Sequence, residues 1–239
     1  MVRRCLAYAA ITGFSAAVSL ASAQADNSAV IELFTSQGCS SCPPADKLLG
    51  QFATEPNLIA ISFPIDVWDY LGWKDTLADP RNTARWKSYS KARGDRQVYT
   101  PQAVINGSAH ALGSDRGAID KAIVKSRQNP HVMSVPVKLD GRQVSVGGTA
   151  IGAGAQMFVA GVASAVTVKI TRGENKGRTV TYYNVLRSWE RFEGWTGQPG
   201  SWTLPALKRD GVDAAAVFVQ ASSEGMPGAI LGAAIASLK

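Results

Sequence analysis

The sequence predicts an α/β amino-terminal half followed by an antiparallel, β-rich and sandwich-like carboxy-terminal half. Three observations support this prediction. Apolar, strand-like runs alternate with helical spacing up to about residue 130. A Cys-x-x-Cys pair, Cys39 and Cys42, lies where the first of these runs gives way to a helix. From Val132 onward, short strand-like segments replace the helical spacing.

The composition is that of an ordinary globular protein. The chain has 239 residues, of which 46% are hydrophobic and 18% are charged, and this excludes disordered, collagen-like and coiled-coil proteins. The length fits one large domain or two of about 100 residues each. Three cysteines are too few for a disulfide scaffold. Beyond the amino-terminal segment no apolar run approaches the roughly 18 residues of a membrane span.

The first 25 residues have the layout of a secretory signal peptide. Arg3 and Arg4 precede an uncharged run, Cys5–Leu20. Ala21–Ala23 is a small-residue cleavage signal, and Ala23–Ala25 is a second candidate. An uncleaved anchor is the alternative, but the run is short and rich in alanine and serine. A lipoprotein would need its cysteine at the cleavage point. We therefore expect residues 1–25 to be removed and the protein to be secreted or periplasmic, with no membrane span left after cleavage.

The charge of the mature chain is modest and scattered. Without the two leader arginines, 23 basic residues stand against 18 acidic ones, a net charge of +5. No five basic residues follow one another, which is typical of a solvated surface. Basic stripes interleaved with aromatic residues are missing as well, so nucleic acid is not an expected partner.

The amino-terminal half begins with two short apolar runs separated by a helix. Ala29–Thr35 and Leu58–Phe63 are apolar enough to be buried parallel strands. Between them Ala45–Phe52 follows helical spacing. Pro43 and Pro44 are tolerated at its start because the first N–H groups of a helix have no intrahelical partner. The order is therefore strand, Cys-x-x-Cys, helix, strand.

A long connection and a hairpin with a helix follow. Pro64–Gln97 is polar and aromatic, with helical character over Arg81–Ala92. The Asn106-Gly107 pair after an apolar strand is a hairpin signal, so Ser108–Leu112 is expected to be the returning strand. Asp115 is expected to cap the last helix of this half.

This order of elements resembles the thioredoxin fold. The shared features are the Cys-x-x-Cys pair at a strand-to-helix junction, the Thr100-Pro101 pair directly before a strand, and the final hairpin and helix. The resemblance implies a thioredoxin-like domain over residues 26–130, with Pro64–Gln97 as a helical insertion. It also implies that Pro101 is a cis-proline facing the cysteines, and that Thr100 and Pro101 present backbone to a substrate.

The two cysteines suggest thiol–disulfide chemistry. The thiolate is the reactive form of cysteine, and the start of a helix stabilises an anion. We expect Cys39 to be the exposed nucleophile and Cys42, one turn later, to be the buried resolving thiol; the spacing lets them close a disulfide. The predicted function is an exported thiol–disulfide oxidoreductase that acts on protein or small-molecule thiols and disulfides. The Ser40-Ser41 pair between the cysteines leaves the redox direction open.

Three alternatives remain for the cysteine pair. It could be a structural disulfide in a non-catalytic binding or accessory protein with a groove around Pro101. A zinc site would need four ligands, and the spacing of His110 and His131 matches no common zinc module. Copper bound by the two thiolates and His110 is chemically possible. No cofactor is expected in the predicted function.

Glu32 is a further candidate, as a proton carrier. It interrupts an apolar strand seven positions before Cys39. The thioredoxin resemblance implies a buried carboxylate on this strand that moves protons for the resolving cysteine, usually at the position of Leu33. A shift of one residue moves a side chain to the other face of a strand. A solvated or salt-bridged role for Glu32 is therefore the favoured alternative.

Aromatic residues gather in the insertion and offer two interpretations. Trp68, Tyr70 and Trp73, with Asp66 and Asp69, could form a wall on the substrate side. Core packing of the extra helices is the alternative, and it is the one we expect.

The carboxy-terminal half, residues 131–239, is predicted to be a β-rich domain. The expected strands are Val135–Leu139, Gln143–Val146, Met157–Gly161, Val166–Ile170, Arg178–Leu186, Ser201–Leu204 and Ala214–Gln220. A small apolar helix or tail is expected over Ala229–Leu238. The sequence places no histidine–cysteine or paired-carboxylate cluster here.

Three stretches resemble a narrower family. Glu32–Asp46, Trp68–Trp73 and Arg172–Arg187 are similar to a bacterial family of secreted thioredoxin-like proteins known only as a domain of unknown function. The resemblance covers nearly the whole mature chain and implies its fold and export, but no substrate. Arg172, Glu174, Asn184 and Arg187 could line a shared surface; loop structure and hairpin ion pairs explain them equally well.

Overall fold

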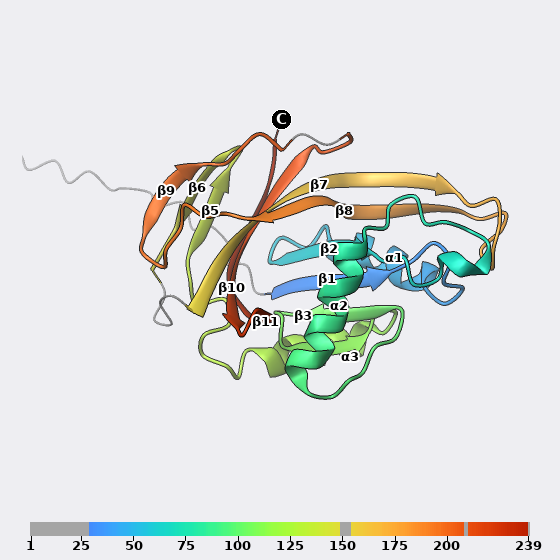
Figure 1. The fold of residues 1–239 in the computed structure, drawn as a ribbon, viewed down its shortest axis with the longest axis horizontal. Coiled ribbons are helices and arrows are strands. Elements are labelled where there is room, and N and C mark those ends of the chain that lie inside the picture. Colours follow the sequence, from blue (N-terminus) through green and yellow to red (C-terminus); the bar gives the residue numbers. More distant parts are fainter. Residues whose placement is uncertain (1–28, 149–153, 208–209, 239) are drawn as a thin grey trace, which may run out of the picture.

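The computed structural model describes residues 29–148, 154–207 and 210–238, so the predicted signal peptide lies outside it. It has a mixed α/β fold with few helices and one large sheet (Figure 1). The elements before residue 130 are β1 (Ala29–Thr35), α1 (Pro43–Phe52), β2 (Leu58–Pro64), η1 (Asp69–Leu71), α2 (Pro80–Arg93), β3 (Gln102–Ile105), β4 (Ala109–Leu112) and α3 (Arg116–Ser126). Those after it are β5 (Val137–Asp140), β6 (Gln143–Val146), β7 (Ala155–Lys169), β8 (Thr179–Arg191), β9 (Gly200–Thr203), β10 (Ala214–Ser223) and β11 (Met226–Ser237).

Strands from both halves of the chain join in the large sheet. Its order is β11-β10-β7-β8-β2-β1-β3-β4. The halves meet where β2 pairs in parallel with β8, with Ser62 opposite Val185. The predicted domain boundary at residues 130 and 131 falls between α3 and β5 and stays a prediction. None of the helices in the described ranges is long and apolar enough to cross a membrane.

Strand β1 is buried along its whole length because helices cover both faces of the sheet beside it. Val30 and Phe34 belong to one apolar core with residues of α2, whereas Ile31 and Leu33 pack with α1 and α3. A strand buried on both faces is apolar throughout rather than alternating, as its sequence indicates. The period of two places Glu32 on the α2 side.

A second sheet of three strands, β5-β6-β9, covers one end of the large sheet (Figure 1). Its inner residues, among them Val144 and Val146 of β6, form one apolar core with Val159 of β7, Val217 of β10 and Leu231 of β11. The β7–β8 hairpin extends from this end toward the opposite end of the molecule, where η1 lies (Figure 1). The hairpin thereby connects the β-rich part with the region around the cysteines.

Most predicted elements are confirmed, but the strands predicted over Met157–Gly161 and Val166–Ile170 are joined in the single strand β7, and the predicted carboxy-terminal helix or tail is wrong. Strand β1 has the predicted bounds, and Asp115 caps α3 by accepting a hydrogen bond from the Ala118 N–H at 2.9 Å. The segment Ala229–Leu238 is neither helix nor tail, because all of it up to Ser237 lies within β11, which pairs along β10. Its small residues are buried on both faces, so no alternation is visible in the sequence. A side chain at Gly232 would collide with the Val135 carbonyl, so glycine lets the two segments approach.

Candidate disulfide site

Cys39 and Cys42 form a disulfide between the end of β1 and the start of α1. Their Cα atoms are 5.4 Å apart. Cys42 is the N-cap residue of α1, and its carbonyl accepts hydrogen bonds from the Ala45 and Asp46 N–H groups at 2.8 and 3.1 Å. The first helical turn begins with two prolines, as predicted. The helix start is therefore built around the second cysteine.

The disulfide is less accessible than the sequence suggests. Cys39 is 4% exposed and Cys42 is fully buried. The Cys39 sulfur accepts a hydrogen bond from the Thr100 hydroxyl at 3.4 Å and lies 3.4 Å from the Ser41 Oγ. Cys39 is thus the outer cysteine of the pair, but neighbouring side chains cover it.

Thr100 and Pro101 lie beside the disulfide, and the peptide bond between them is cis. The Thr100 carbonyl accepts a hydrogen bond from the Ser41 hydroxyl at 3.4 Å, and its Oγ1 accepts one from the Trp68 indole N–H at 2.8 Å. Trp68 also packs against Gly38, where an added Cβ would lie 2.9 Å from the Trp68 Cβ. Glycine at position 38 therefore lets Trp68 approach the cysteine loop, residues 36–42 between β1 and α1.

The aromatic residues of the insertion divide into two groups. Trp86 and Tyr89 of α2 are buried in the core. Trp68 contacts Thr100, and the Trp73 indole donates a hydrogen bond to the Gln37 Oε1 at 2.8 Å. Tyr70 is 75% exposed next to Trp68. Core packing of Trp68, Tyr70 and Trp73 is therefore the wrong expectation: Trp68 and Trp73 bond residues around the cysteines, and Tyr70 is exposed.

Glu32 is buried in an ion pair with α2. Arg85 donates to both carboxylate oxygens, at 2.6 and 3.0 Å, and the Tyr89 hydroxyl donates to one of them at 2.5 Å. Arg85 also donates to the Gln220 Oε1 of β10 at 3.0 Å. The salt-bridged alternative describes Glu32, and no contact of the described residues joins its carboxylate to a cysteine.

Asp46 is a buried carboxyl on the cysteine side of β1, and the sequence reasoning missed it. It lies four residues after Cys42, so the two share one face of the helix. Its Oδ1 accepts a hydrogen bond from the Thr35 hydroxyl at 2.7 Å, and its Oδ2 is buried without a hydrogen-bond partner. Burial, together with the nearby Asp75 carboxylate, raises the pKa of Asp46 to about 8 against the opposing effect of Thr35.

Asp75 adds a second buried carboxyl to this region. It accepts hydrogen bonds from the Gln37 N–H at 2.7 Å and from the Leu77 N–H at 2.8 Å. Burial raises the pKa of Asp75 to about 6, although these hydrogen bonds oppose the shift. Two carboxyls with raised pKa values therefore lie around the loop that carries Cys39.

We expect Asp46→Asn to remove a pH dependence of folding stability. The carboxyl has a pKa near 3.8 when unfolded and about 8 when folded, so the folded state binds the proton more tightly. The bound proton stabilises the folded state most below pH 4, and this stabilisation is lost as the pH rises to 8. Urea unfolding measures the free energy of unfolding of both proteins. The difference, variant minus wild type, should increase over this range by roughly 1.4 kcal/mol for each pH unit.

An exposed acidic residue of α3 supplies the control for this experiment. Asp120→Asn makes the same replacement of a carboxyl by an amide at an exposed position, without removing a buried group. Its stability should follow that of the wild type across the same pH range. Parallel profiles for the wild type and Asp46→Asn would show that Asp46 does not hold the proton.

Asn175 brings the carboxy-terminal half into the site. It lies in the loop between β7 and β8 and is 1% exposed. Its side-chain amide donates to the carbonyls of Gln37 and Cys39 at 2.9 and 2.8 Å. Nothing in the sequence singles out this asparagine within the stretch that resembles the unknown-function family. Asn184, which we did single out, instead donates to the Ala60 carbonyl at 3.0 Å.

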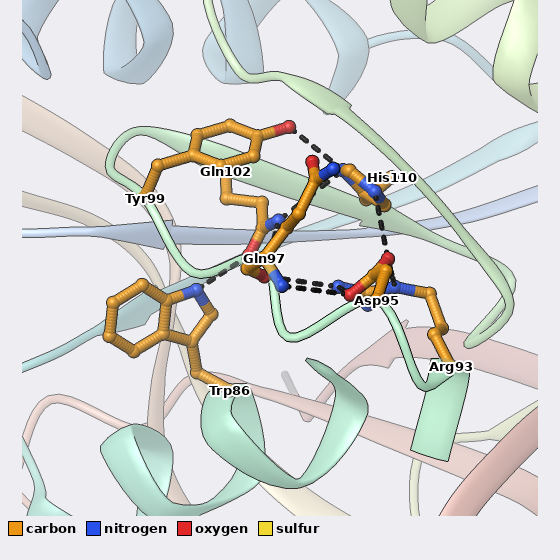
Figure 2. A network of polar contacts seen from close by, with 7 residues as sticks. All are labelled: Trp86, Arg93, Asp95, Gln97, Tyr99, Gln102 and His110. Atoms are coloured by element: carbon orange, nitrogen blue, oxygen red, sulfur yellow. Dashed lines mark hydrogen bonds and ion pairs between the residues drawn. The ribbon is translucent and has the colours of Figure 1, made fainter. Parts of the chain in front are cut away.

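His110 belongs to a polar network with Arg93, Asp95, Tyr99 and Gln102 (Figure 2). Its Nδ1 lies 2.8 Å from the Tyr99 hydroxyl and its Nε2 lies 3.2 Å from Asp95, which also pairs with Arg93 at 2.8 Å. Burial, followed by the charge of Arg93, lowers the pKa of His110 against the opposing effect of Asp95. The network holds Tyr99, the residue before Thr100.

The copper hypothesis finds no support in this geometry. Both ring nitrogens of His110 already have protein partners. In the part of the chain that the structure describes, no three histidine, cysteine, aspartate or glutamate side chains are grouped so that they could hold a metal ion.

The fold and the site define a mixed α/β protein with a large sheet and a buried Cys-x-x-Cys disulfide at a helix start. The chain belongs to the family DUF1223, proteins of unknown function, whose sequence profile matches residues 30–220. It is similar to the crystal structure of protein AGR_C_4864 from Agrobacterium tumefaciens, with 33% sequence identity and a TM-score of 0.74. The match covers 89% of this chain and 95% of that one. No protein with a curated description matches the chain significantly.

Proposed function

We propose that this protein is an exported thiol–disulfide oxidoreductase with a thioredoxin-like domain over residues 26–130. The observation that supports this function best is the disulfide at the start of α1 with Thr100-Pro101 directly beside it. The order β1-α1-β2, then α2, then the β3–β4 hairpin and α3, supports the proposed fold. The predicted signal peptide supports a secreted or periplasmic location, where dithiols and disulfides exchange.

In the proposed reaction the reduced protein attacks a substrate disulfide. The Cys39 thiolate forms a bond to one substrate sulfur and displaces the other as a thiolate. The Cys42 thiol then loses its proton and attacks the Cys39 sulfur, which releases the second substrate thiolate. The substrate gains two electrons, and the protein dithiol becomes the Cys39–Cys42 disulfide. The reverse sequence oxidises a substrate dithiol.

The surroundings of the cysteines suit this chemistry. The Thr100 hydroxyl donates a hydrogen bond to the Cys39 sulfur at 3.4 Å, and a hydrogen bond that stabilises the thiolate lowers the pKa of the thiol. The start of α1 adds a partial positive charge. Asp46 provides a buried carboxyl on the face of α1 that carries Cys42, with a pKa close to that of a free thiol. We assign Asp46, in place of Glu32, as the group that exchanges a proton with Cys42.

A redox titration of the mature protein in glutathione buffers tests the function. The fraction of free Cys39 and Cys42 is read by alkylation and mass spectrometry. We expect a reduction potential between about −120 and −270 mV, the range of exchange-active proteins. A potential below about −300 mV would contradict the proposal, because structural disulfides have such values.

A non-catalytic binding or accessory protein with a structural disulfide is the second candidate. It is favoured by the burial of both cysteines, since a covered disulfide resists reduction. Trp68, Tyr70 and the Thr100-Pro101 pair would then form a binding surface rather than a substrate site. Resistance of the folded protein to mild reductant, together with a low potential in the titration, would select this candidate.

A further inference from the structure

We propose that the β7–β8 hairpin contributes to the disulfide site through Asn175 at its tip. Asn175 is a positioning residue that stabilises the disulfide. The inference rests on the proposed function and assigns a role to the carboxy-terminal half. Asn175 lies 136 residues after Cys39, yet its amide group donates to the Cys39 carbonyl. The tip of the hairpin therefore contacts the cysteine loop directly.

The contact is specific because one amide group holds two carbonyls of the same loop. The Asn175 Nδ2 donates to Gln37 and to Cys39, the residues on either side of Gly38. The Cys39 carbonyl also accepts from the Cys42 N–H at 3.2 Å, which closes the turn between the cysteines. Asn175 therefore fixes the carbonyl on which this turn depends.

The hairpin tip is itself held by backbone hydrogen bonds. The Gly177 N–H donates to the Ile170 carbonyl at 2.8 Å, and the Arg178 N–H donates to the Asn175 carbonyl at 3.1 Å. Gly173 has φ of +72° and approaches Trp73, where an added Cβ would lie 3.0 Å from the Trp73 Cβ. A turn with this many internal bonds holds the Asn175 side chain in one place.

The cysteine loop is held from its other side by the insertion. The Gln37 side chain accepts from the Trp73 indole at 2.8 Å, and its backbone N–H donates to Asp75 at 2.7 Å. The hairpin tip contacts Trp73 as well, so residues 37–39 lie between two mutually packed segments. Asn175 supplies the bonds from the hairpin side.

The hydrogen bonds from Asn175 to the cysteine loop should favour the disulfide over the dithiol. The equilibrium between dithiol and disulfide depends on the fraction of dithiol molecules whose two sulfur atoms are positioned to form a bond. A loop fixed in the turn of the disulfide brings them together more often than a free loop. Loss of the two amide bonds should therefore lower the effective concentration of one thiol at the other and make the disulfide easier to reduce.

Asn175→Ala tests the inference in the glutathione titration. We expect the constant for disulfide formation to fall about tenfold, which raises the reduction potential by about 30 mV. Asn175→Leu fills a similar volume without a donor, and it serves if the alanine variant fails to fold. Circular dichroism and thermal unfolding establish that each variant is folded before its potential is read.

Asn184→Gly is the matched control. Asn184 is an asparagine of the same hairpin whose amide donates to one backbone carbonyl, that of Ala60, away from the cysteine loop. Its φ of 45° suits glycine, so the change removes the amide without backbone strain. The control should lose stability but keep the wild-type potential.

The outcomes separate the inference from the proposed function. A wild-type potential for both Asn175 variants, with lower melting temperatures alone, would show that Asn175 acts only on stability. An equal shift in Asn184→Gly would show that any loosening of the hairpin is enough, and would also overturn the assignment. The wild-type potential itself, below about −300 mV, would contradict the redox function while leaving the shift at Asn175 measurable.

Discussion

Replacement of Cys39 by alanine is expected to abolish thiol–disulfide exchange. The Cys39 sulfur is the outer one of the pair and accepts a hydrogen bond from the Thr100 hydroxyl, whereas Cys42 is fully buried at the helix start. A substrate disulfide can reach Cys39 with less rearrangement than it needs to reach Cys42. Reduction of a glutathione-blocked peptide should fall to the rate measured without protein. Exchange that persists in Cys39→Ala would refute the assignment of the nucleophile.

Replacement of Cys42 by alanine should have a different effect, and the contrast tests the order of the steps. Cys39 can still attack, but nothing resolves the mixed disulfide that forms. Mass spectrometry should therefore detect Cys42→Ala with the substrate attached, and the double variant Cys39→Ala/Cys42→Ala should carry none. Failure to trap the adduct while the single variant remains folded would argue against Cys42 as the resolving thiol.

The sequence predicts the fold well where local signals and tertiary structure agree. The proline pair at α1, the cap at Asp115 and the turn at Asn106-Gly107 each arise from backbone chemistry within a few residues, and all three are found. The strand β11 was missed because its pattern is tertiary. It pairs with β10 on one side and is covered on both faces, so glycine and alanine replace the alternation that marks an exposed strand.

The site was predictable only where a short sequence motif marks it, at the Cys-x-x-Cys pair and at the Thr-Pro pair before β3. Cys39, Cys42, Thr100 and Pro101 follow from a motif, and the structure brings them together. Asn175 could not be found in this way, because its hydrogen bonds depend on the length and path of a hairpin that begins more than a hundred residues later.

The two acidic residues illustrate how far periodicity reaches. Glu32 stands out in the sequence because it interrupts an apolar strand, but the period of two directs it toward α2 and away from the cysteines. Asp46 does not stand out, because an acidic residue in the first turn of a helix is ordinary. Helical spacing of four from Cys42 was the available signal, and only its burial makes the carboxyl unusual.

Glu32→Leu is expected to destabilise the fold strongly while leaving the chemistry of the disulfide intact. The carboxylate is fully buried and balances the guanidinium of Arg85, whose central carbon lies 4.8 and 4.9 Å from the ring centres of Tyr89 and Trp189. Removing one partner of a buried pair leaves the other charge uncompensated and costs about 3–5 kcal/mol. Urea unfolding at neutral pH measures this loss.

The double variant Glu32→Leu/Arg85→Leu separates the charge effect from a catalytic one. With both charges gone no ion is left unpaired, so the double variant should be more stable than Glu32→Leu alone, although Tyr89 and Gln220 lose their shared partner. The exchange rate per folded molecule should match the wild type in both variants, because Glu32 contacts α2 rather than the cysteines. A folded Glu32→Leu protein with lost exchange and an altered pH profile would return the proton-carrier role to Glu32 and remove it from Asp46.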